Sequence, residues 1–345
     1  MAVDLSVDEM YRQMKAMLGD IAPDFELRYK AELACEINRL KKERNAVILG
    51  HNYMEPALYH SVADFTGDSL ELSRRAAKTD ADIIVFCGVK FMAETAKILN
   101  PTKTVLLPSE KAGCSLAASI TAEDVRALKR RFPGVPVVSY VNTYADVKAE
   151  SDICCTSSNA KAVVESLGTD TVIFLPDEYL ARNLARETGK RIIFPTLSEP
   201  TADEDFQIIG WHGRCEVHEK FTVGDIRRVR EQFPDVVILA HPECSPEVVE
   251  AADFSGSTSA MIKYVEKTTA PRYLLLTECA MGDNIAAANP DKNMLRLCMV
   301  RCPHMNQITL EDTLASLQHT QYVIEVPEEV RVRALRAVER MIAIG

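Results

Sequence analysis

The hydrophobic positions of the chain gather in short continuous runs, and three of these runs end in the same way. The runs 46–50, 136–140 and 236–240 are rich in valine and isoleucine and show no polar/apolar alternation. This pattern is typical of parallel strands that are buried on both faces. Each run is closed by two polar side chains one residue apart: His51 and Tyr53, Tyr140 and Asn142, His241 and Glu243. The repeated design, at intervals of about 90 and about 100 residues, predicts an internally repeated architecture.

The rest of the pattern alternates apolar runs with helical periodicity. Further strands are predicted at 81–86, 104–107, 152–155, 171–175, 192–194 and 273–277. Helices are predicted over 6–20, 24–43, 69–77, 145–150, 156–167, 178–187, 246–252, 255–266 and from 327 to the last residue. This order predicts βαβ units with parallel strands. Because ligands gather at the carboxyl ends of such strands, we expect the three polar pairs to converge on one site.

Composition and charge narrow the class of protein. A chain of 345 residues with 47% hydrophobic and 26% charged residues is expected to fold into two or three compact units. The net charge of −10 argues against a nucleic-acid partner. The acidic start, with Asp4, Asp8 and Glu9, does not resemble a secretory signal. No apolar run approaches the roughly 18 residues of a spanning helix, so we predict a cytoplasmic protein without a membrane partner.

The cysteines are the first candidates for chemistry, because ten thiols in the cytoplasm are not expected to form structural disulfides. Cys114, Cys215 and Cys302 lie in loops, one near the end of each repeat. They lack the close pairing of a structural zinc site, but a ligand set drawn from three repeats suits an iron–sulfur cluster. The alternative is three loop thiols without a ligand role. Packing is the expected role of the cysteines in or beside apolar runs: Cys35, Cys87, Cys154, Cys155 and Cys279.

Two hydroxyl-rich turns each open a predicted helix, Ser157-Ser158-Asn159 and Gly256-Ser257-Thr258-Ser259. A helix N-terminus offers free backbone N–H groups and the positive end of the helix dipole, so it can bind carboxylate or phosphate. Ordinary N-capping is the alternative interpretation. Because the two turns occupy corresponding places in the repeats, we favour anion binding.

Histidine, glutamate and tyrosine side chains at the strand ends suggest binding and proton transfer. His51 and His241 can donate to a substrate carboxylate, although a turn histidine without function is the alternative. Glu243 and Tyr53 are candidate proton-transfer groups, and burial is expected to raise the pKa of Glu243 toward neutrality. Cys215 and His218 have the spacing of half a zinc site, but the second half is missing.

Eight short motifs follow one another in the chain between about residues 46 and 310. Together they resemble the quinolinate synthase family. The motifs are His51-Asn52-Tyr53, Gly67-Asp68-Ser69-Leu70-Glu71-Leu72, Lys90-Phe91-Met92-Ala93-Glu94-Thr95-Ala96, Tyr140-Val141-Asn142-Thr143, Cys215-Glu216-Val217-His218, His241-Pro242-Glu243, Gly256-Ser257-Thr258-Ser259 and Cys302-Pro303-His304-Met305.

The resemblance implies an α/β fold of three similar three-layer α/β/α domains, with short parallel sheets around a pseudo-threefold axis. The first domain would comprise residues 1–115 and 303–345, with the N- and C-terminal helices. The second would comprise 116–216 and the third 217–302. The resemblance also implies a 4Fe-4S cluster at the domain junction. Its protein ligands would be only Cys114, Cys215 and Cys302, so that the fourth iron faces the substrate.

The implied reaction condenses iminoaspartate with dihydroxyacetone phosphate to quinolinate, phosphate and water, in the de novo route to NAD. An open iron site can assist such a reaction as a Lewis acid. An aspartate oxidase or dehydrogenase would supply the iminoaspartate. The resemblance makes Tyr53, Glu243 and Tyr140 the catalytic groups, and His218 would orient the cluster region. The implied substrate-binding residues are His51, Ser69, Tyr140, Asn142, Ser157, His241, Glu243, Ser257 and Thr258.

Two departures from the family pattern and two other functions complete the prediction. Only Cys298 precedes Cys302, where some members carry a Cys-x-x-Cys-x-x-Cys run, and the segment 190–212 has no assigned role.

The first alternative function is a zinc-dependent phosphosugar aldolase built from Cys215, His218, His241 and Glu243. The second is an iron–sulfur sensor or electron carrier, which would need no substrate pocket.

Overall fold

The structure, a computed structural model, describes residues 5–195, 206–295 and 300–345. The strands form three short sheets, and every strand pairing described in register is parallel. Helices alternate with strands along the chain, which confirms the predicted α/β class. No helix among the described residues is long and apolar enough to cross a membrane.

The contacts of the chain divide it into two compact units. The first unit comprises Met1–Gly113 and Ile262–Glu325, and the second comprises Cys114–Met261 and Val326–Gly345. The boundaries of the three predicted domains stay a prediction.

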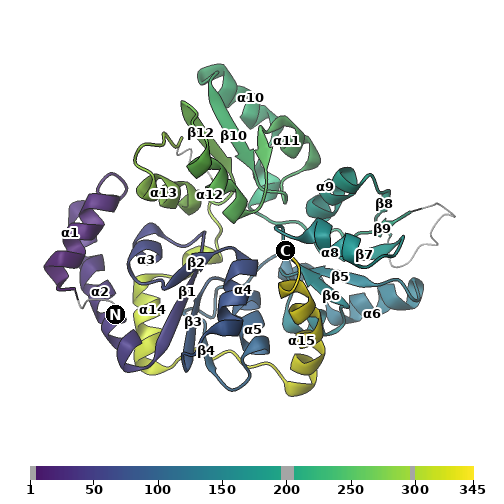
Figure 1. Cartoon of the computed structure of the whole chain (residues 1–345), viewed down its shortest axis with the longest axis horizontal. Helices are drawn as coiled ribbons and strands as arrows, with labels where there is room; N and C mark the ends of the chain where they lie inside the picture. Colours follow the sequence, from purple (N-terminus) through teal and green to yellow (C-terminus); the bar gives the residue numbers. More distant parts are fainter. Residues whose placement is uncertain (1–4, 196–205, 296–299) are drawn as a thin grey trace. The chain divides into compact units, whose positions relative to one another are not determined.

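The first unit is built on a sheet with strand order β2-β1-β3-β4. The strands β1 and β3 are buried along almost their whole length, because helices cover both faces: α4 and α5 on one, α2 and α14 on the other (Figure 1). The elements of this layer are α2 (Asp24–Glu43), β1 (Ala46–His51), α3 (Pro56–Ser61), β2 (Phe65–Gly67), α4 (Ser69–Lys78), β3 (Ile83–Cys87), α5 (Lys90–Leu99), β4 (Thr104–Leu106) and α14 (Leu310–His319).

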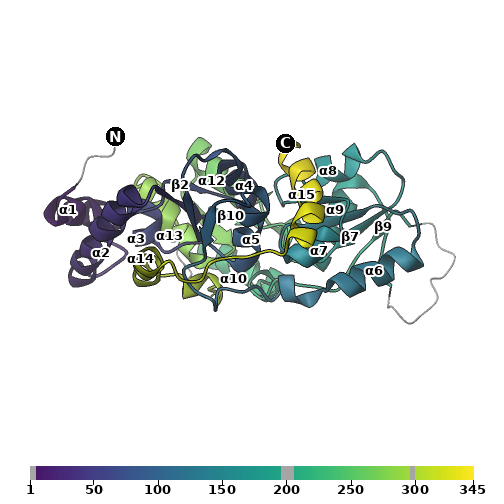
Figure 2. The same cartoon turned by 90° about the horizontal axis from the view of Figure 1, so that it is seen from below.

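Four further elements of the first unit lie outside this sheet. The helix α1 (Val7–Leu18) begins with the predicted capping box of Ser6 and Glu9 and lies along α2 (Figure 2). The strand β12 (Arg272–Leu276) leads into α13 (Cys279–Ala288), which packs on α3. The short 3-10 helix η3 (Met305–Gln307) precedes α14.

The second unit carries a five-stranded sheet with order β6-β5-β7-β9-β8. The helices α8 and α9 pack against each other and on its strands, and α6 and α7 form another packed pair. The elements are η1 (Ala117–Ser119), α6 (Ala122–Arg131), β5 (Val137–Tyr140), α7 (Ala145–Ala149), β6 (Ile153–Cys155), α8 (Ala160–Ser166), β7 (Val172–Leu175), α9 (Glu178–Thr188), β8 (Ile192–Ile193) and β9 (Ile208–Ile209).

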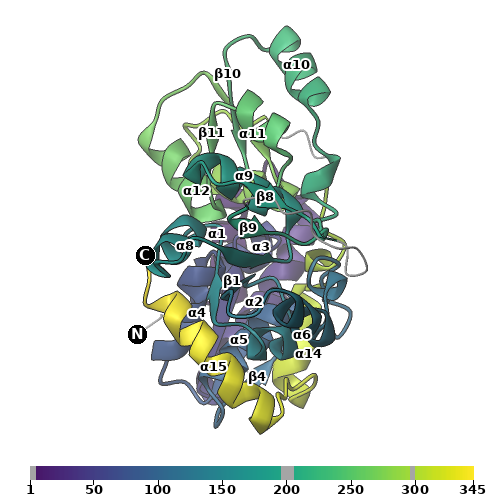
Figure 3. The same ribbon diagram turned by 90° about the vertical axis from the view of Figure 1, so that its right-hand side faces the viewer.

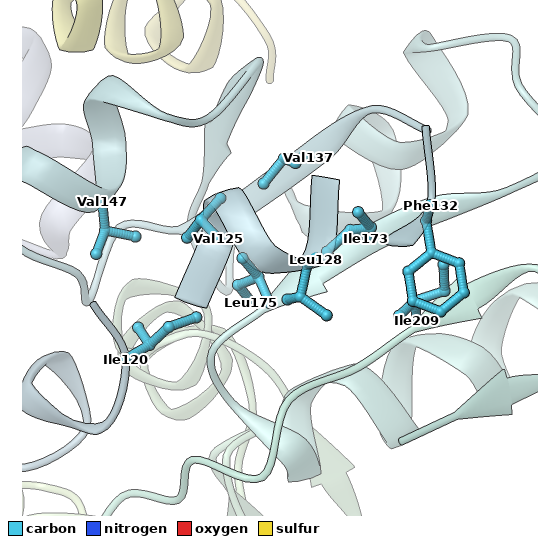
Figure 4. Close-up of a cluster of buried hydrophobic side chains, with 9 residues drawn as sticks. All are labelled: Ile120, Val125, Leu128, Phe132, Val137, Val147, Ile173, Leu175 and Ile209. Carbon is cyan, nitrogen blue, oxygen red and sulfur yellow. The ribbon is translucent and has the colours of Figure 1, made fainter. Parts of the chain in front are cut away.

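A buried apolar cluster fixes this sheet. Val137 of β5, Ile173 and Leu175 of β7 and Ile209 of β9 meet Val125 of α6 in the cluster drawn in Figure 4. All five side chains are completely inaccessible to solvent. Packing at this density holds the strands in register, so it also fixes the polar residues at the end of β5.

The first two strands of the third repeat, β10 and β11, also belong to the second unit. The strand β10 pairs in parallel with β11. The elements around them are η2 (His218–Lys220), α10 (Val223–Gln232), β10 (Val236–Ala240), α11 (Pro246–Ala251) and β11 (Phe254–Ser255), and α12 (Thr258–Lys267) follows.

One contact recurs in all three repeats and confirms the internal repetition. An aspartate after the first helix of the repeat accepts a hydrogen bond at 2.8 Å from a backbone N–H of the repeat's first strand. The backbone N–H of the same aspartate donates to a carbonyl of that strand. The pairs are Asp64 with Ile48, Asp152 with Val137, and Asp253 with Ile238.

The last helix, α15 (Glu328–Ile342), packs on α7 and β6 of the second unit (Figure 2). The end of the chain lies beside α8 (Figure 3). It is fixed by Asn159, whose Nδ2 donates to the carbonyl oxygens of Met341 at 3.1 Å and Ile344 at 2.9 Å. Asn159 Oδ1 accepts from the backbone N–H of Thr156 at 2.8 Å. The turn that contains Ser157 is therefore tied to the last residues of the chain.

The predicted strands agree with the observed ones to within a residue or two, but several helices were not predicted. The helices α3, α6, α10, α13 and α14 fall in stretches for which the hydrophobic pattern predicted none. In α6, α10 and α14 only a few positions are buried, and the polar residues between them obscure the helical periodicity.

Candidate active site

Cys114, Cys215 and Cys302 share one local geometry. Each lies three residues before a short 3-10 helix, namely η1, η2 or η3. The sulfur of Cys114 accepts a hydrogen bond from the backbone N–H of Ala117 at 3.4 Å, and that of Cys302 accepts one from Met305 at 3.5 Å. The backbone N–H of His218 interacts in the same way with Cys215. Backbone donors aimed at sulfur lower a thiol pKa, although burial, followed by the charge of Glu243, outweighs this and raises the pKa of Cys215.

The similarity of the three cysteine loops extends to the helix that follows. A threonine seven residues after each cysteine caps that helix, and it accepts from the backbone N–H of an aspartate three residues further on. The resulting pattern is Cys-x6-Thr-x2-Asp. The members are Cys114, Thr121 and Asp124; Cys215, Thr222 and Asp225; and Cys302, Thr309 and Asp312. This spacing could have identified the three cysteines as equivalent from the sequence.

Within the second unit, the loops of Cys114 and Cys215 lie against each other. The indole N–H of Trp211 donates to the carbonyl oxygen of Ser119 at 3.0 Å. A Cβ atom on Gly213 would lie 2.4 Å from Ser119 Oγ and 2.6 Å from the carbonyl oxygen of Pro176. Only glycine allows this close approach. The two cysteine loops are therefore held at a fixed separation.

Glu178, the first residue of α9, stabilises the loop that precedes Cys215. Its carboxylate accepts from the guanidinium groups of Arg182 at 2.9 Å and Arg214 at 3.0 Å, and it lies 3.3 Å from His212 Nδ1. Its backbone N–H donates to the Gly213 carbonyl at 2.8 Å. Charge-assisted bonds of this kind make the loop that precedes Cys215 rigid.

Glu243 is the centre of a buried polar cluster in the second unit. Its Oε1 accepts from the Tyr140 hydroxyl at 2.5 Å and lies 3.5 Å from Asn142 Nδ2. Its Oε2 lies 2.8 Å from His218 Nδ1. The ring of His218 stacks on that of His241, with centroids 4.5 Å apart. The structure thus brings together the predicted residues of the second and third repeats, and it adds His218 as a direct partner of Glu243.

The charge of Glu243 corrects one expectation. Burial alone would raise the pKa of Glu243, but the imidazoles of His218 and His241 and the hydrogen bonds from His218 and Tyr140 hold that pKa well below its ordinary value. The predicted shift toward neutrality is therefore wrong, because four polar groups surround the carboxylate. Glu243 is therefore an anion in this cluster.

The carboxyl group whose pKa is raised in this cluster is that of Asp177. Burial, followed by the charge of Glu243, raises the pKa of Asp177 well above its usual value. Its Oδ1 accepts from the backbone N–H of Leu180 at 2.6 Å, whereas its buried Oδ2 has no hydrogen-bond partner among the described residues. Two neighbouring carboxyls with oppositely shifted pKa values are characteristic of acid/base sites.

Backbone contacts determine the tautomer of two candidate binding histidines. The N–H of Tyr53 donates to His51 Nδ1 at 3.2 Å, and the N–H of Glu243 donates to His241 Nδ1 at 3.3 Å. With Nδ1 as the acceptor, a neutral ring carries its proton on Nε2. His241 Nε2 lies 3.3 Å from the Ser157 hydroxyl, so the two groups can bind the same anion.

The hydroxyl residues lie at the starts of helices, as predicted. Ser257 precedes α12 and accepts from the backbone N–H of Ala260 at 3.3 Å, and Thr258 is the first residue of that helix. Ser69 is the first residue of α4 in the first unit. Ser257 and Thr258 are buried and Ser69 is half-buried. Ser257 therefore acts at least as a cap.

The first unit holds His51, Tyr53, Ser69 and Cys302. The rings of His51 and Tyr53 meet edge to face, with centroids 4.7 Å apart. The hydroxyl of Tyr53 lies 2.5 Å from Thr277 Oγ1, at the end of β12. Thr277 was not predicted, because nothing in the apolar run 273–277 marks its last residue as functional.

Most of the remaining cysteines behave as expected. Cys87, Cys154 and Cys155 are buried and outside any disulfide, and burial raises the pKa of Cys154 to about 11. Cys244, for which no role was predicted, is buried as well. Cys279 is disulfide-bonded, so the expected packing as a free thiol is wrong for it. Cys298, whose departure from the family pattern was noted, lies outside the described residues, as does much of the unassigned segment 190–212.

Comparison with known proteins gives a single family. The family model described as Quinolinate synthetase A protein matches residues 35–343. The chain is 57% identical over 305 residues to "Quinolinate synthase 2" of Mesorhizobium japonicum, covering 88% of this chain and 89% of the relative. It is 52% identical over 341 residues to "Quinolinate synthase" of Sinorhizobium fredii, covering 99% of this chain and 89% of the relative. For "Quinolinate synthase" of Caulobacter vibrioides the identity is 53% over 321 residues, covering 92% and 83%.

Proposed function

Because the chain belongs to the quinolinate synthase family, we propose that it condenses iminoaspartate with dihydroxyacetone phosphate to quinolinate. The balance is one phosphate and two waters released, with no oxidant or reductant consumed. The observation that carries the proposal is the buried cluster in which Tyr140 and His218 contact the Glu243 carboxylate, in the same unit as two equivalent cysteine loops.

Cys114, Cys215 and Cys302 would hold a 4Fe-4S cluster as its only protein ligands. The donor set fits this group, because none of the three cysteines is in a disulfide and the sulfurs of Cys114 and Cys302 each accept a backbone N–H bond. Thiolates are the ligands that iron–sulfur clusters take. When bound, the cluster would supply Lewis acidity at its open iron.

The substrates carry carboxylates and a phosphate, and the chain offers several groups suited to anions. Helix N-termini bind anions through free N–H groups, and Ser69, Ser257 and Thr258 lie at two of them. Ser157 and His241 form a second kind of donor pair, with Oγ and Nε2 3.3 Å apart. His51 would present its Nε2 proton in the same way as His241.

Proton transfers would be divided between a carboxylate and two tyrosines. Glu243, held as an anion by its polar partners, is placed to accept a proton during condensation and dehydration. Tyr140 donates to Glu243 Oε1, so its oxygen can take up a proton from the substrate as the hydroxyl proton passes to Glu243, and the reverse shift gives the proton back. Tyr53, whose hydroxyl is oriented by Thr277, would serve the second reacting centre.

The test begins with iron and acid-labile sulfide on protein purified without oxygen, followed by an assay with both substrates. We expect about four of each per chain and formation of quinolinate. Cys114→Ser, Cys215→Ser and Cys302→Ser should each lose the cluster and the activity. Cys35→Ser, a change to a half-buried thiol, is the control and should keep both. Normal activity in any one of the first three variants would remove that residue from the ligand set.

A zinc-dependent aldolase is the second candidate function, because one ligand atom each of Cys215, His218 and Glu243 lies within 4.8 Å of the others. That set would fit tetrahedral zinc with one position left for substrate. Stoichiometric zinc in place of iron, together with cleavage of a phosphosugar, would favour this function. The supply of iminoaspartate by an aspartate oxidase or dehydrogenase belongs to the first proposal only.

A further inference from the structure

The turn that carries Tyr53 is fixed by a buried asparagine of α13. Asn284 Nδ2 donates to the carbonyl oxygen of Asn52 at 3.2 Å and to that of Met54 at 2.9 Å. These are the two residues on either side of Tyr53. Because the amide nitrogen has two protons and both acceptors are backbone carbonyls, one side chain fixes the direction of the turn on both sides of the tyrosine.

The turn that carries Glu243 is fixed in the same way by an asparagine of α9. Asn183 Nδ2 donates to the carbonyl oxygens of Pro242 at 2.8 Å and Cys244 at 2.9 Å. These residues again lie on either side of the functional side chain, here Glu243. We call this arrangement, one side-chain nitrogen donating to the carbonyls before and after a site residue, a two-carbonyl contact.

The two asparagines occupy corresponding positions in their helices. Asn183 lies six residues after Asp177, the acidic N-cap of α9, and Asn284 lies six residues after Glu278, the acidic N-cap of α13. The contact thus belongs to the internal repeat and is not a coincidence of two unrelated helices.

The remaining repeat makes the same contact with a different residue. Lys148 of α7, which is fully buried, donates through Nζ to the carbonyl oxygen of Val141 at 2.9 Å and to that of Thr143. Asn142 lies between these two carbonyls. All three turns that end the first strands of the repeats are therefore fixed by a two-carbonyl contact.

The buried oxygens of the two asparagines indicate that the contact has a function. Asn183 Oδ1 and Asn284 Oδ1 are buried and have no hydrogen-bond partner among the described residues. A buried acceptor without a partner costs free energy. A leucine would fill a similar volume without that cost, but it could not donate to the two carbonyls.

We propose that Asn183 and Asn284 are positioning residues of the reaction, which hold Glu243 and Tyr53 in the geometry for proton transfer. The inference rests on the proposed function, in which these two side chains move protons. Neither asparagine is itself a catalytic residue, because each touches only the backbone of the turn.

The test compares Asn183→Leu and Asn284→Leu with a matched control. Asn100 is also buried, and its Nδ2 donates to two carbonyls at 3.0 Å, those of Ala76 and Ala96, neither of which belongs to a site turn. Asn100→Leu should lower the melting temperature as the other two changes do and leave kcat unchanged. Asn183→Leu and Asn284→Leu should lower kcat by about 10- to 100-fold, because small misplacements of reacting groups cost this much.

A double-mutant cycle separates positioning from a general loss of structure. If Asn183 acts through Glu243, Asn183→Leu should change kcat less than about twofold in a Glu243→Gln background. A full additional loss in that background would overturn the proposal, as would an unchanged kcat in Asn183→Leu. If the leucine variants do not fold, Asn183→Ser and Asn284→Ser, which keep one donor, replace them, and an intermediate loss is expected.

The outcome is distinguishable from a failure of the proposed function. A wild-type protein that holds iron but forms no quinolinate from the two substrates would refute the function. A wild-type protein that is active, with Asn183 and Asn284 variants that behave like Asn100→Leu, would refute only the positioning roles.

Discussion

At the scale of single residues, the most consequential is Glu243, because one carboxylate accepts from Tyr140 and contacts His218 while both its oxygens are buried. Glu243→Gln keeps the shape and removes the negative charge. We expect kcat to fall by about 10²–10⁴-fold, the usual contribution of a general acid or base, with iron content unchanged. Parallel measurements of kcat and of iron per chain check this, and an unaltered kcat would remove Glu243 from the mechanism.

Thr277 provides a second prediction at this scale. Its hydroxyl lies 2.5 Å from the Tyr53 hydroxyl, within hydrogen-bond distance. Thr277→Val conserves the shape and removes that bond, so we expect kcat/KM to fall about tenfold, the equivalent of one hydrogen bond of roughly 1.4 kcal/mol. Thr277→Ser is the control and should retain most of the activity. Equal activity in both variants would show that Tyr53 does not depend on this contact.

The sequence predicts the strand-end residues well but not their partners. His51, Tyr140 and His241 follow apolar runs that a reader can recognise. Asn183 and Asn284 lie in the middle of helices, where a polar residue usually faces solvent. Their role depends on contacts with turns 59 and 230 or more residues away in the chain, and no local pattern encodes such a distance.

The direction of the pKa shift of Glu243 is a second property that the sequence alone did not predict. An apolar strand before a carboxylate suggests that the carboxyl group is shielded from water, which would raise the pKa of that group. The lowered pKa results from His218, whose place beside Glu243 is determined by the fold and not by its spacing from Cys215.

At the scale of elements, Gly213 is the point where the loops of Cys114 and Cys215 meet. Gly213→Ala would place a Cβ 2.6 Å from the Pro176 carbonyl oxygen, and that backbone atom cannot move aside easily. We expect a loss of about 1–3 kcal/mol in the free energy of unfolding and weaker retention of iron. Denaturant unfolding and metal analysis after dialysis against a chelator measure the two effects.

Gly282 provides the matched control for this substitution. It lies within α13, and a Cβ there would meet nothing within 4 Å. Gly282→Ala should be neutral or should stabilise the protein by up to about 1 kcal/mol, because alanine is the better helix former. A comparable loss in both variants would mean that the close approach at Gly213 is not the cause.

The docking of α15 should depend on pH through Glu150. Burial raises the pKa of Glu150, but hydrogen bonds from Arg333 of α15 and Arg126 of α6 outweigh it and hold the pKa below 4.5. A depressed pKa contributes stability that is complete above the unfolded value near 4.5 and is lost as the pH falls through the folded value.

We therefore expect Glu150→Gln to lower the free energy of unfolding by about 1 kcal/mol at pH 7, a value reduced for the partly exposed arginines. The difference from wild type should shrink below pH 4. Urea unfolding at both pH values measures it. Glu325→Gln, which changes a largely exposed side chain, is the control and should have little effect at either pH. A constant difference between Glu150→Gln and wild type would contradict the linkage.

At the scale of the whole molecule, the internal repetition is the feature that the hydrophobic pattern predicted most directly. The aspartate contacts of Asp64, Asp152 and Asp253 and the three Cys-x6-Thr-x2-Asp loops show that it extends to polar detail. The helices α6, α10 and α14 begin with the same Thr-x2-Asp cap. An alignment of the three repeats with one another would therefore predict these three helices from the sequence.

The hydrogen bonds from Asn159 to Met341 and Ile344 have a practical consequence for anyone who produces the protein. An affinity tag or reporter joined after Gly345 would begin two residues beyond Ile344, whose carbonyl accepts from Asn159 of the Ser157 turn. Motion of the appended sequence would therefore be transmitted to the turn of Ser157, a candidate substrate-binding residue. Purification handles therefore belong at the opposite end of the chain, and activity compared between the two tag placements would reveal how far this coupling reaches.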